Sequence, residues 1–282
     1  MNGVAQVRKE RRTRSWLAGV AAITVALGGL TAPAVAQDAS HAPSEFAEFA
    51  AGHTVNEAGY PDAEILAPAK GTGTVKANSA VNIRRGPHSG YYSTNGSYPN
   101  GTTLTLLCKT FGQKVTGPAG TTNRWYKTAG RKYVSGGYLV VTKTPGNCTE
   151  PTGDDYPWSG QCPTPPGVGN ERDTWNYTKG QCTSFVSFRA QGRLGKNLSG
   201  LGQASEWNNR APAKGISVGT MPLIGAVAVS ESGTYGHVAY VTKVNSDFSF
   251  TVEEYNYVAK CKHGVRANLT LANSSFSSFI YP

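Results

Sequence analysis

The residue best suited to nucleophilic chemistry is Cys182, in the segment 179–189 (KGQCTSFVSFR). Gly180 ends the preceding loop, and the residues that recur after it with helical spacing are Phe185, Val186, Phe188 and Arg189. We therefore predict a short amphipathic helix that begins at Gln181 and has Cys182 in its first turn. The first N–H groups of a helix have no partner inside the helix, and the helix dipole is positive there. Both effects favour a thiolate, which is the nucleophilic form of cysteine.

A base for this thiol is predicted further along the chain. Two later stretches alternate as strands do: 236–241 and 251–256. His237, in the first, would act as base to Cys182. Glu254, in the second, would hold the imidazole in one tautomer, with Asn256 assisting it or lining the site. Alternation places Glu253 on the opposite face of the strand, which favours Glu254 over its neighbour.

Donors for a developing oxyanion are predicted at the same helix start. The backbone N–H of Cys182 points outward from the helix terminus, and the side chain of Gln181 is a candidate second donor. The cysteine and histidine spacings match no pattern of metal ligands. We therefore expect neither a metal nor a cofactor at this site.

These motifs resemble those of the CHAP domain, a papain-like amidohydrolase and peptidase fold of bacterial cell-wall hydrolases. The motifs that support the resemblance are QCTSFV around Cys182, GHV around His237, E-x-N at Glu254 and Asn256, YPW at 156–158 and LIGAVAV at 223–229. The resemblance covers residues 154–282. It implies an α+β fold in which short helices pack on an antiparallel β-sheet, with a thiol site built from these four residues.

Other elements of this region follow from local pattern. We predict a helix at 204–211 and strands at 224–229, 237–244, 248–255 and 276–281. His263 and His53 lie in no supporting motif, and we expect both to be exposed.

Composition indicates an extracellular, turn-rich and β-rich protein. The chain has 282 residues, 39% of them hydrophobic and only 16% charged, with 34 glycines and 14 tyrosines. That length has room for about two small domains. The formal net charge is +10, and the charged residues of the first 36 positions account for +4 of it. The remaining positive charge suits a polyanionic cell wall or simply confers solubility. No dense Lys/Arg cluster follows position 36, so nucleic-acid binding is not expected.

The first 36 residues have the pattern of a signal peptide. A basic region up to Arg14 precedes an apolar stretch at 16–30 and the cleavage motif AVA at 34–36. No second candidate span follows, so we expect a secreted protein, extracellular or bound to the cell wall, with no stable membrane insertion after cleavage. Residues 37–71 have no sustained pattern and are predicted to be a linker or pro-segment. We expect a monomer.

Residues 72–142 are predicted to form a small all-β barrel, because short strands alternate with turns. The motifs VNIRRGP, PNGT, WYK and YVSGGYL resemble those of a bacterial SH3 domain. Such domains usually bind cell-wall peptide or glycan, which implies a wall-binding role here. The aromatic residues that could form a ligand groove are Tyr91, Tyr92, Tyr98 and Trp125; alternatively, Trp125 belongs to the core. Residues 143–153 are predicted to be a linker.

Five cysteines are an odd number for a secreted protein, which indicates one free thiol. If Cys182 is free, the other four allow three pairings. Cys108 and Cys148 flank the later strands of the first domain, so we expect them to pair. Cys162 and Cys261 would then link parts of the second domain.

The hypothesis is therefore a secreted thiol hydrolase that cleaves an amide bond of peptidoglycan. The motifs are the same for an endopeptidase and for an N-acetylmuramoyl-L-alanine amidase, and we favour the endopeptidase. Two alternatives stay open at this point. One is a non-catalytic wall-binding protein, in which residues 72–142 perform the function. The other is a secreted thiol protease that acts on proteins.

Overall fold

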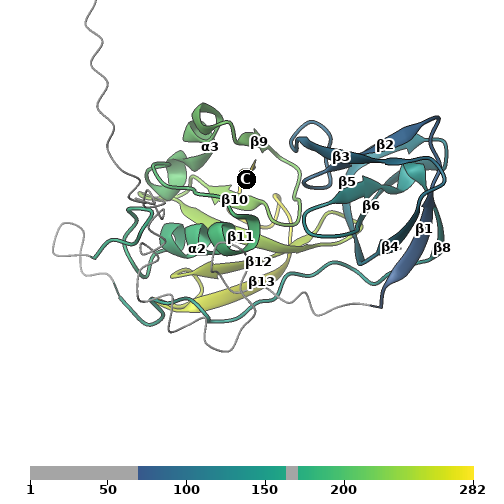
Figure 1. The fold of residues 1–282 in the computed structure, drawn as a ribbon. Helices are drawn as coiled ribbons and strands as arrows, with labels where there is room; N and C mark the ends of the chain where they lie inside the picture. Colours follow the sequence, from purple (N-terminus) through teal and green to yellow (C-terminus); the bar gives the residue numbers. More distant parts are fainter. Residues whose placement is uncertain (1–68, 163–170) are drawn as a thin grey trace, which may run out of the picture. The chain divides into compact units, whose positions relative to one another are not determined.

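The computed structural model describes residues 69–162 and 171–282 (Figure 1). The predicted signal peptide, nearly all of the predicted segment 37–71 and His53 lie outside the described residues. Within the two described stretches, no helix combines the length and the apolar character that crossing a membrane requires.

The N-terminal strands, β1 to β8, occupy residues 71–143 and form two antiparallel sheets. The three-stranded sheet has the order β4-β1-β8: Thr103–Leu106, Gly71–Val75 and Leu139–Lys143. The five-stranded sheet has the order β3-β2-β7-β6-β5: Thr94–Pro99, Ala80–Arg84, Tyr133–Ser135, Gly120–Lys127 and Cys108–Gly117. Alternate residues of β2 and β4 point inward, so Val81, Ile83, Leu104 and Leu106 enter one core. Residues 136–138 of the YVSGGYL motif form a 3₁₀ turn, η1 (Gly136–Tyr138).

Two of the four aromatic residues proposed for a ligand groove are buried. Trp125 is a core residue, and its indole N–H donates to the Gln113 carbonyl at 2.9 Å. Tyr92 is also buried, and the Tyr91 ring stacks on Tyr281 with centroids 4.3 Å apart. Tyr91 and Tyr92 are thus already engaged by protein, which contradicts the prediction that they face a ligand.

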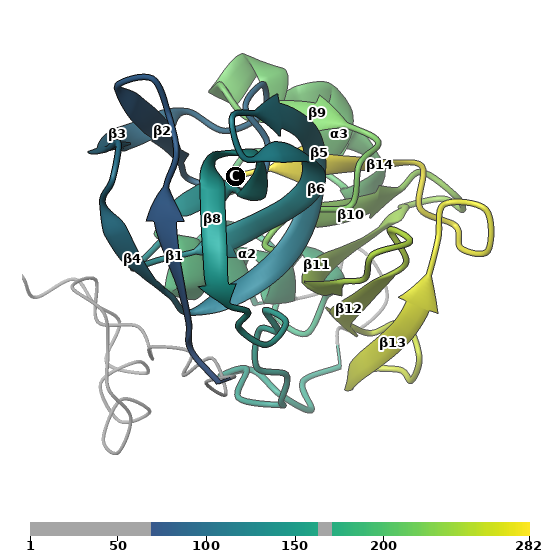
Figure 2. The same ribbon diagram turned by 90° about the vertical axis from the view of Figure 1, so that its right-hand side faces the viewer.

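The second part of the chain is built on one six-stranded antiparallel sheet (Figure 2). Its order is β13-β12-β11-β10-β14-β9: His263–Leu269, Phe250–Tyr255, His237–Val244, Val227–Ser230, Ser278–Tyr281 and Ser217–Gly219. Strands β10, β11 and β12 are almost wholly buried, as expected of strands covered on both faces. This sheet places β11 directly beside β12.

One long helix, α2 (Cys182–Leu194), packs against β11 and β12 (Figure 1). It begins where the sequence predicted, with Gln181 as its N-cap residue, and ends at Gly195, whose left-handed backbone suits a glycine C-cap. Its first nine residues are all buried. The prediction of an amphipathic helix was therefore wrong: polar side chains on its other face, such as Ser187 and Arg189, have polar or charged partners inside the protein.

The other predicted elements are present in shortened form. Residues 204–211 form a 3₁₀ turn, η2 (Ala204–Glu206), and one turn of helix, α3 (Trp207–Arg210). Pro212 follows, opens η3 (Pro212–Lys214) and prevents a longer helix. Strand β10 begins at Val227 rather than 224, because a tight turn with Gly225 at φ 81° precedes it. Two strands of the six-stranded sheet were not predicted from the sequence: β9 and β13.

Candidate functional site

The candidate nucleophile, Cys182, lies at the N-terminus of α2 and is buried. The structure joins Cys108 to Cys148 and Cys162 to Cys261, the two pairs that the sequence led us to expect. Cys182 is consequently the free thiol among the five cysteines of the chain. Its sulfur accepts hydrogen bonds from the backbone N–H groups of Thr183 and Val238. Such bonds stabilise a thiolate.

His237 is the first residue of β11, and a glycine turn places it there. Gly236 has φ of 71°, a region that L side chains rarely adopt. A Cβ at this position would lie 2.5 Å from both the Ser205 nitrogen and the Ser230 oxygen. Glycine therefore serves two needs at once: the left-handed turn and the close approach of η2. The side chain of His237 forms a hydrogen bond with Cys182.

Glu254, on the neighbouring strand β12, holds the imidazole from its other side. His237 Nε2 lies 2.8 Å from Glu254 Oε2, so the nitrogen left for Cys182 is Nδ1. The carboxylate is fully buried and is also bound by Arg266 of β13. Arg266 donates from Nε to Oε1 at 2.5 Å and from its terminal nitrogen to Oε2 at 2.9 Å. A bidentate pair of this kind fixes the plane of the carboxylate.

Charge in this cluster is matched so that the thiol and the imidazole ionise together. Burial by itself would raise the pKa of Cys182, but the His237 charge and the hydrogen bonds to the sulfur outweigh it, and the pKa is lowered. Burial by itself would lower the pKa of His237, but the Cys182 thiolate and Glu254 together raise it to about 9. Burial by itself would raise the pKa of Glu254, but hydrogen bonds from His237 and Arg266 outweigh burial, and the pKa of Glu254 is lowered. The lowered pKa of the thiol and the raised pKa of the imidazole both favour a thiolate beside an imidazolium.

Glu253 faces the other side of β12 and belongs to a separate buried cluster. Its Oε1 lies 2.7 Å from Arg189 Nε and 2.6 Å from an Arg193 terminal nitrogen, both on α2. Burial would raise the pKa of Glu253, but the two guanidinium groups and His263 lower it to about 2. His263 Nε2 lies 3.1 Å from Glu253 Oε2 and is only partly exposed. The expectation that His263 is exposed was therefore wrong.

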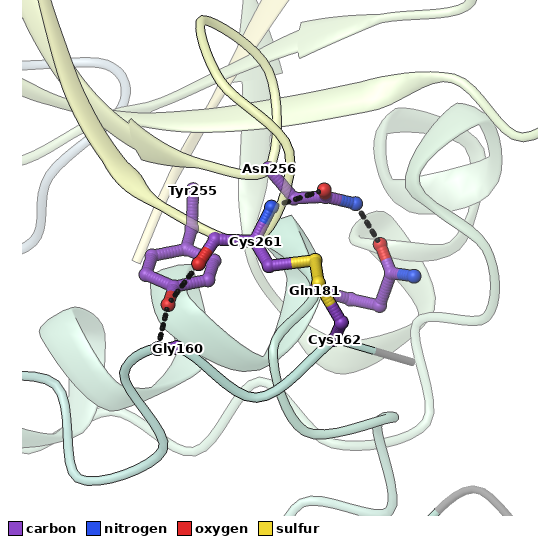
Figure 3. The surroundings of a disulfide bond; sticks show 6 residues. All are labelled: Gly160, Cys162, Gln181, Tyr255, Asn256 and Cys261. Carbon is purple, nitrogen blue, oxygen red and sulfur yellow. Dashed lines mark hydrogen bonds between the residues drawn. A yellow bond between two sulfur atoms is a disulfide. The ribbon is translucent and has the colours of Figure 1, made fainter. Parts of the chain in front are cut away.

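Asn256 lies just after β12, and its side chain forms hydrogen bonds with Gln181 and Cys261. Its Nδ2 donates to Gln181 Oε1 at 2.9 Å, and its Oδ1 accepts from the Cys261 N–H at 2.8 Å (Figure 3). Asn256 thus lines the site beside Gln181, while the hydrogen bond to the imidazole is made by Glu254.

These residues meet at a pocket of about 450 Å³. It is lined by Gln181, Cys182, His237, Asn256, two tyrosines, three serines and two glycines. Tyr235 and Tyr257 are 53% and 46% exposed, so both present ring surface at the pocket. The Tyr257 ring lies 4.4 Å from the His237 ring and 4.1 Å from the Arg266 guanidinium. His237 is the only lining side chain that can bear positive charge, so the pocket walls suit an uncharged polar chain such as a peptide backbone.

No group of three or more metal-ligating side chains is found in residues 69–162 and 171–282. The residues that sequence reasoning missed are Arg266 and Tyr257. Tyr257 follows Asn256 directly but belongs to no motif, and Arg266 lies on β13, which was not predicted. The available signal was the alternation of apolar residues at Val265, Ala267 and Leu269, which is weak for a strand.

Comparison with known proteins places the CHAP motifs within one family. Residues 172–256 match the family model of the CHAP domain. The chain is 47% identical over 81 residues to the staphylococcal secretory antigen SsaA of Staphylococcus aureus, which covers 29% of this chain and 31% of that protein. It is 41% identical over 105 residues to the SsaA of Staphylococcus epidermidis, covering 37% and 39%. The chain thus spans less than two fifths of the length of these relatives.

Among solved structures, a Staphylococcus aureus N-acetylmuramoyl-L-alanine amidase is similar at 36% identity and a TM-score of 0.34, covering 37% of this chain and 31% of that one. The residues matched by the CHAP model, 172–256, span the positions of Cys182, His237 and Glu254. The part of this chain that is similar to the CHAP domain is thus residues 172–256.

Proposed function

We propose that this protein is a cell-wall hydrolase that cleaves an amide bond of peptidoglycan with Cys182 as nucleophile. The observation that carries the proposal is the buried Cys182–His237–Glu254 hydrogen-bonded series at a pocket whose other lining side chains are uncharged. A thiolate that opens on a pocket and has a proton donor beside it is suited to acyl transfer. The CHAP match of residues 172–256 supports peptidoglycan as the substrate.

The reaction proceeds in two steps. The Cys182 thiolate attacks the amide carbonyl carbon, and the negative charge passes to the carbonyl oxygen. That oxygen is stabilised by the backbone N–H of Cys182 and by the Gln181 side chain. The C–N bond then breaks as the His237 imidazolium gives its proton to the leaving amine. In the second step His237 removes a proton from water, which attacks the thioester and frees the carboxylate and the thiolate. Glu254 holds the imidazole in place through both steps.

The proposal extends to where the enzyme acts. The basic and apolar leader, together with relatives named as secretory antigens, supports export through a signal peptide. The N-terminal strands are proposed to form an SH3-like barrel that binds the cell wall. A second pocket, of about 410 Å³, lies on these strands among Arg84, Lys114 and Tyr138 and is the proposed contact surface.

The test uses chain 37–282 and its Cys182→Ala variant on purified sacculi, with casein as a second substrate. Soluble wall fragments should be released by the first protein only, and casein should stay intact. Mass spectrometry of the fragments identifies the bond. A freed muramic-acid carboxyl, together with the amine of the first stem residue, marks an amidase. A new terminus within the stem or cross-bridge, with the bond to muramic acid intact, marks an endopeptidase. Equal release by the two proteins would refute the thiol mechanism. Cleavage of casein alone would refute the substrate.

A further inference from the structure

One backbone N–H and two side-chain amides form a continuous hydrogen-bond series beside the pocket (Figure 3). The Cys261 N–H donates to Asn256 Oδ1, and Asn256 Nδ2 donates to Gln181 Oε1. The series therefore ends on the residue directly before the nucleophile. We call these three groups the amide relay.

The relay has only one self-consistent polarity. A backbone N–H can only donate, so the Asn256 atom that faces Cys261 must be the oxygen. The Asn256 nitrogen is then turned toward Gln181 and needs an acceptor, so Gln181 must present its own oxygen. The Gln181 Nε2 group is left pointing away from Asn256, as Figure 3 shows. A single peptide N–H thus determines which end of the Gln181 amide is available to other partners.

The start of the relay is firmly held. Asn256 and Cys261 both have φ of 56°, a left-handed backbone that is unfavourable for residues other than glycine and least so for asparagine. Cys261 is joined to Cys162 by a disulfide, and its carbonyl accepts from the Tyr255 hydroxyl at 2.7 Å. The same hydroxyl accepts from the Gly160 N–H at 2.7 Å. A covalent bond and a hydrogen bond therefore hold Cys261, whose N–H starts the relay, and a second hydrogen bond holds the tyrosine beside it.

We propose that Asn256 and Cys261 are positioning residues that aim the Gln181 Nε2 group into the pocket, where it donates to the oxyanion of the tetrahedral intermediate. Gln181 and Cys182 are adjacent in sequence, and both line the pocket. Asn256 acts on Gln181 rather than on the imidazole, which is already held by Glu254. This inference rests on the proposed amide hydrolysis and adds the origin of its second oxyanion donor.

Asn256→Asp is the variant that reverses the relay without removing it. One aspartate oxygen still accepts from Cys261, and aspartate also tolerates the left-handed backbone. The second oxygen now faces Gln181 and needs a donor, so the Gln181 amide turns its nitrogen inward and its oxygen toward the pocket. Loss of one side-chain donor to an oxyanion lowers kcat by about 10²–10³-fold. We expect Asn256→Asp to lower kcat to the same degree as Gln181→Ala, with little change in KM.

The double variant distinguishes the relay from independent effects. In the Gln181→Ala background, Asn256→Asp should lower kcat by less than about threefold, because the donor it misdirects is already gone. Asn256→Ala should likewise lower kcat by less than about threefold in the Gln181→Ala background. This variant controls for the negative charge that aspartate adds. The rate of Cys182 alkylation by iodoacetamide, measured against pH, should stay unchanged in Gln181→Ala and Asn256→Ala, because alkylation needs a thiolate but no oxyanion donor. Losses that multiply in the double variants, or a wild-type kcat in Asn256→Asp, would overturn the inference.

A readout without turnover separates this inference from the proposed function. In nitrogen-15-labelled protein, Asn256→Asp should shift the Gln181 side-chain amide resonance, because that nitrogen becomes a donor to a carboxylate. An unchanged resonance would overturn the relay. If the resonance shifts while the wild-type protein releases nothing from sacculi, the proposed function fails and the relay stands.

Discussion

Replacing Glu254 by glutamine removes one negative charge from the site and almost no volume. The glutamine oxygen can still accept one hydrogen bond, but two donors compete for it: His237 Nε2 and the Arg266 guanidinium. The guanidinium also loses its charge partner and then lies beside an imidazolium. Both changes disfavour the protonated state of His237, and with it the Cys182 thiolate.

The size of the effect follows from the pKa of His237. Its rise from 6.5 to about 9 corresponds to about 3 kcal/mol of extra stability for the imidazolium, since one pKa unit is worth 1.36 kcal/mol. Cys182 and Glu254 share this stabilisation. Cys182 contributes more of it than Glu254 does. If Glu254 supplies about one pKa unit, its loss lowers the population of the ion pair by roughly tenfold. Poorer orientation of the imidazole adds to this, and general acid–base catalysis is worth about 10²–10⁴-fold. We expect Glu254→Gln to lower the rate of hydrolysis by about 10²–10³-fold.

The matched control is Glu253→Gln on the same strand. Glu253 is equally buried and ionised, but it contacts Arg189 and Arg193 and has no bond to His237. Its replacement should lower the free energy of unfolding, because it leaves buried guanidinium groups with less negative charge. It should leave the pH dependence of Cys182 alkylation unchanged.

The assay is fragment release from sacculi, normalised to folded protein, together with alkylation of Cys182 against pH. Glu254→Gln should move the alkylation profile to higher pH, and Glu253→Gln should not. The reasoning is refuted if Glu254→Gln keeps hydrolysis within about threefold of wild type. It is also refuted if the two variants change the alkylation profile equally.

Three further predictions concern pH, Arg266 and the second disulfide. The rate of hydrolysis should depend on pH as a bell-shaped curve, because the pKa of the Cys182 thiol is lowered and that of His237 is raised to about 9. The rate should fall near pH 9, where the imidazolium loses its proton. A midpoint of this alkaline fall near pH 6.5 would contradict the pairing of thiolate and imidazolium. Arg266→Met should raise the pH of the alkaline limb, because the full charge of the Glu254 carboxylate then acts on the imidazole. It should also lower kcat, because the carboxylate and the imidazole are less well oriented. A pH–rate profile identical to that of wild type would refute this role of Arg266. Cys162→Ser with Cys261→Ser opens a loop with a sequence separation of 99 and should lower the free energy of unfolding by about 3–5 kcal/mol; denaturant unfolding measures it, and an unchanged midpoint would contradict the expectation.

The sequence predicted the parts of the site that depend on local pattern. A glycine followed by helical spacing predicted the start of α2 at Gln181, and alternation separated Glu254 from Glu253 on opposite faces of β12. Both follow from the periods of helix and strand, which are readable in a short window. The strand β11 was predicted with its bounds for the same reason.

The features of the site that the sequence did not predict depend on long-range packing. Arg266 reaches Glu254 only because β13 pairs with β12, and the segment 263–269 has too little apolar alternation to indicate a strand. The polar residues of α2 indicated a solvent face, but Arg189 is matched by Glu253 from a strand 64 residues away. Asn256 was expected to assist Glu254 or to line the site, and it lines the site. The sequence did not predict its left-handed backbone or its hydrogen bonds to Gln181 and Cys261. Neither backbone handedness nor a distant partner is visible in a local pattern.

The ionisation of Cys182 can be measured directly from the ultraviolet absorbance of its thiolate, since the other four cysteines are in disulfides. A titration of the wild-type protein should show thiolate absorbance at neutral pH, and Cys182→Ala should show none. His237→Gln should move the midpoint up toward the ordinary thiol value of 9.0. A wild-type midpoint at or above 9.0, unchanged by His237→Gln, would contradict the thiolate–imidazolium pair on which the proposed chemistry depends.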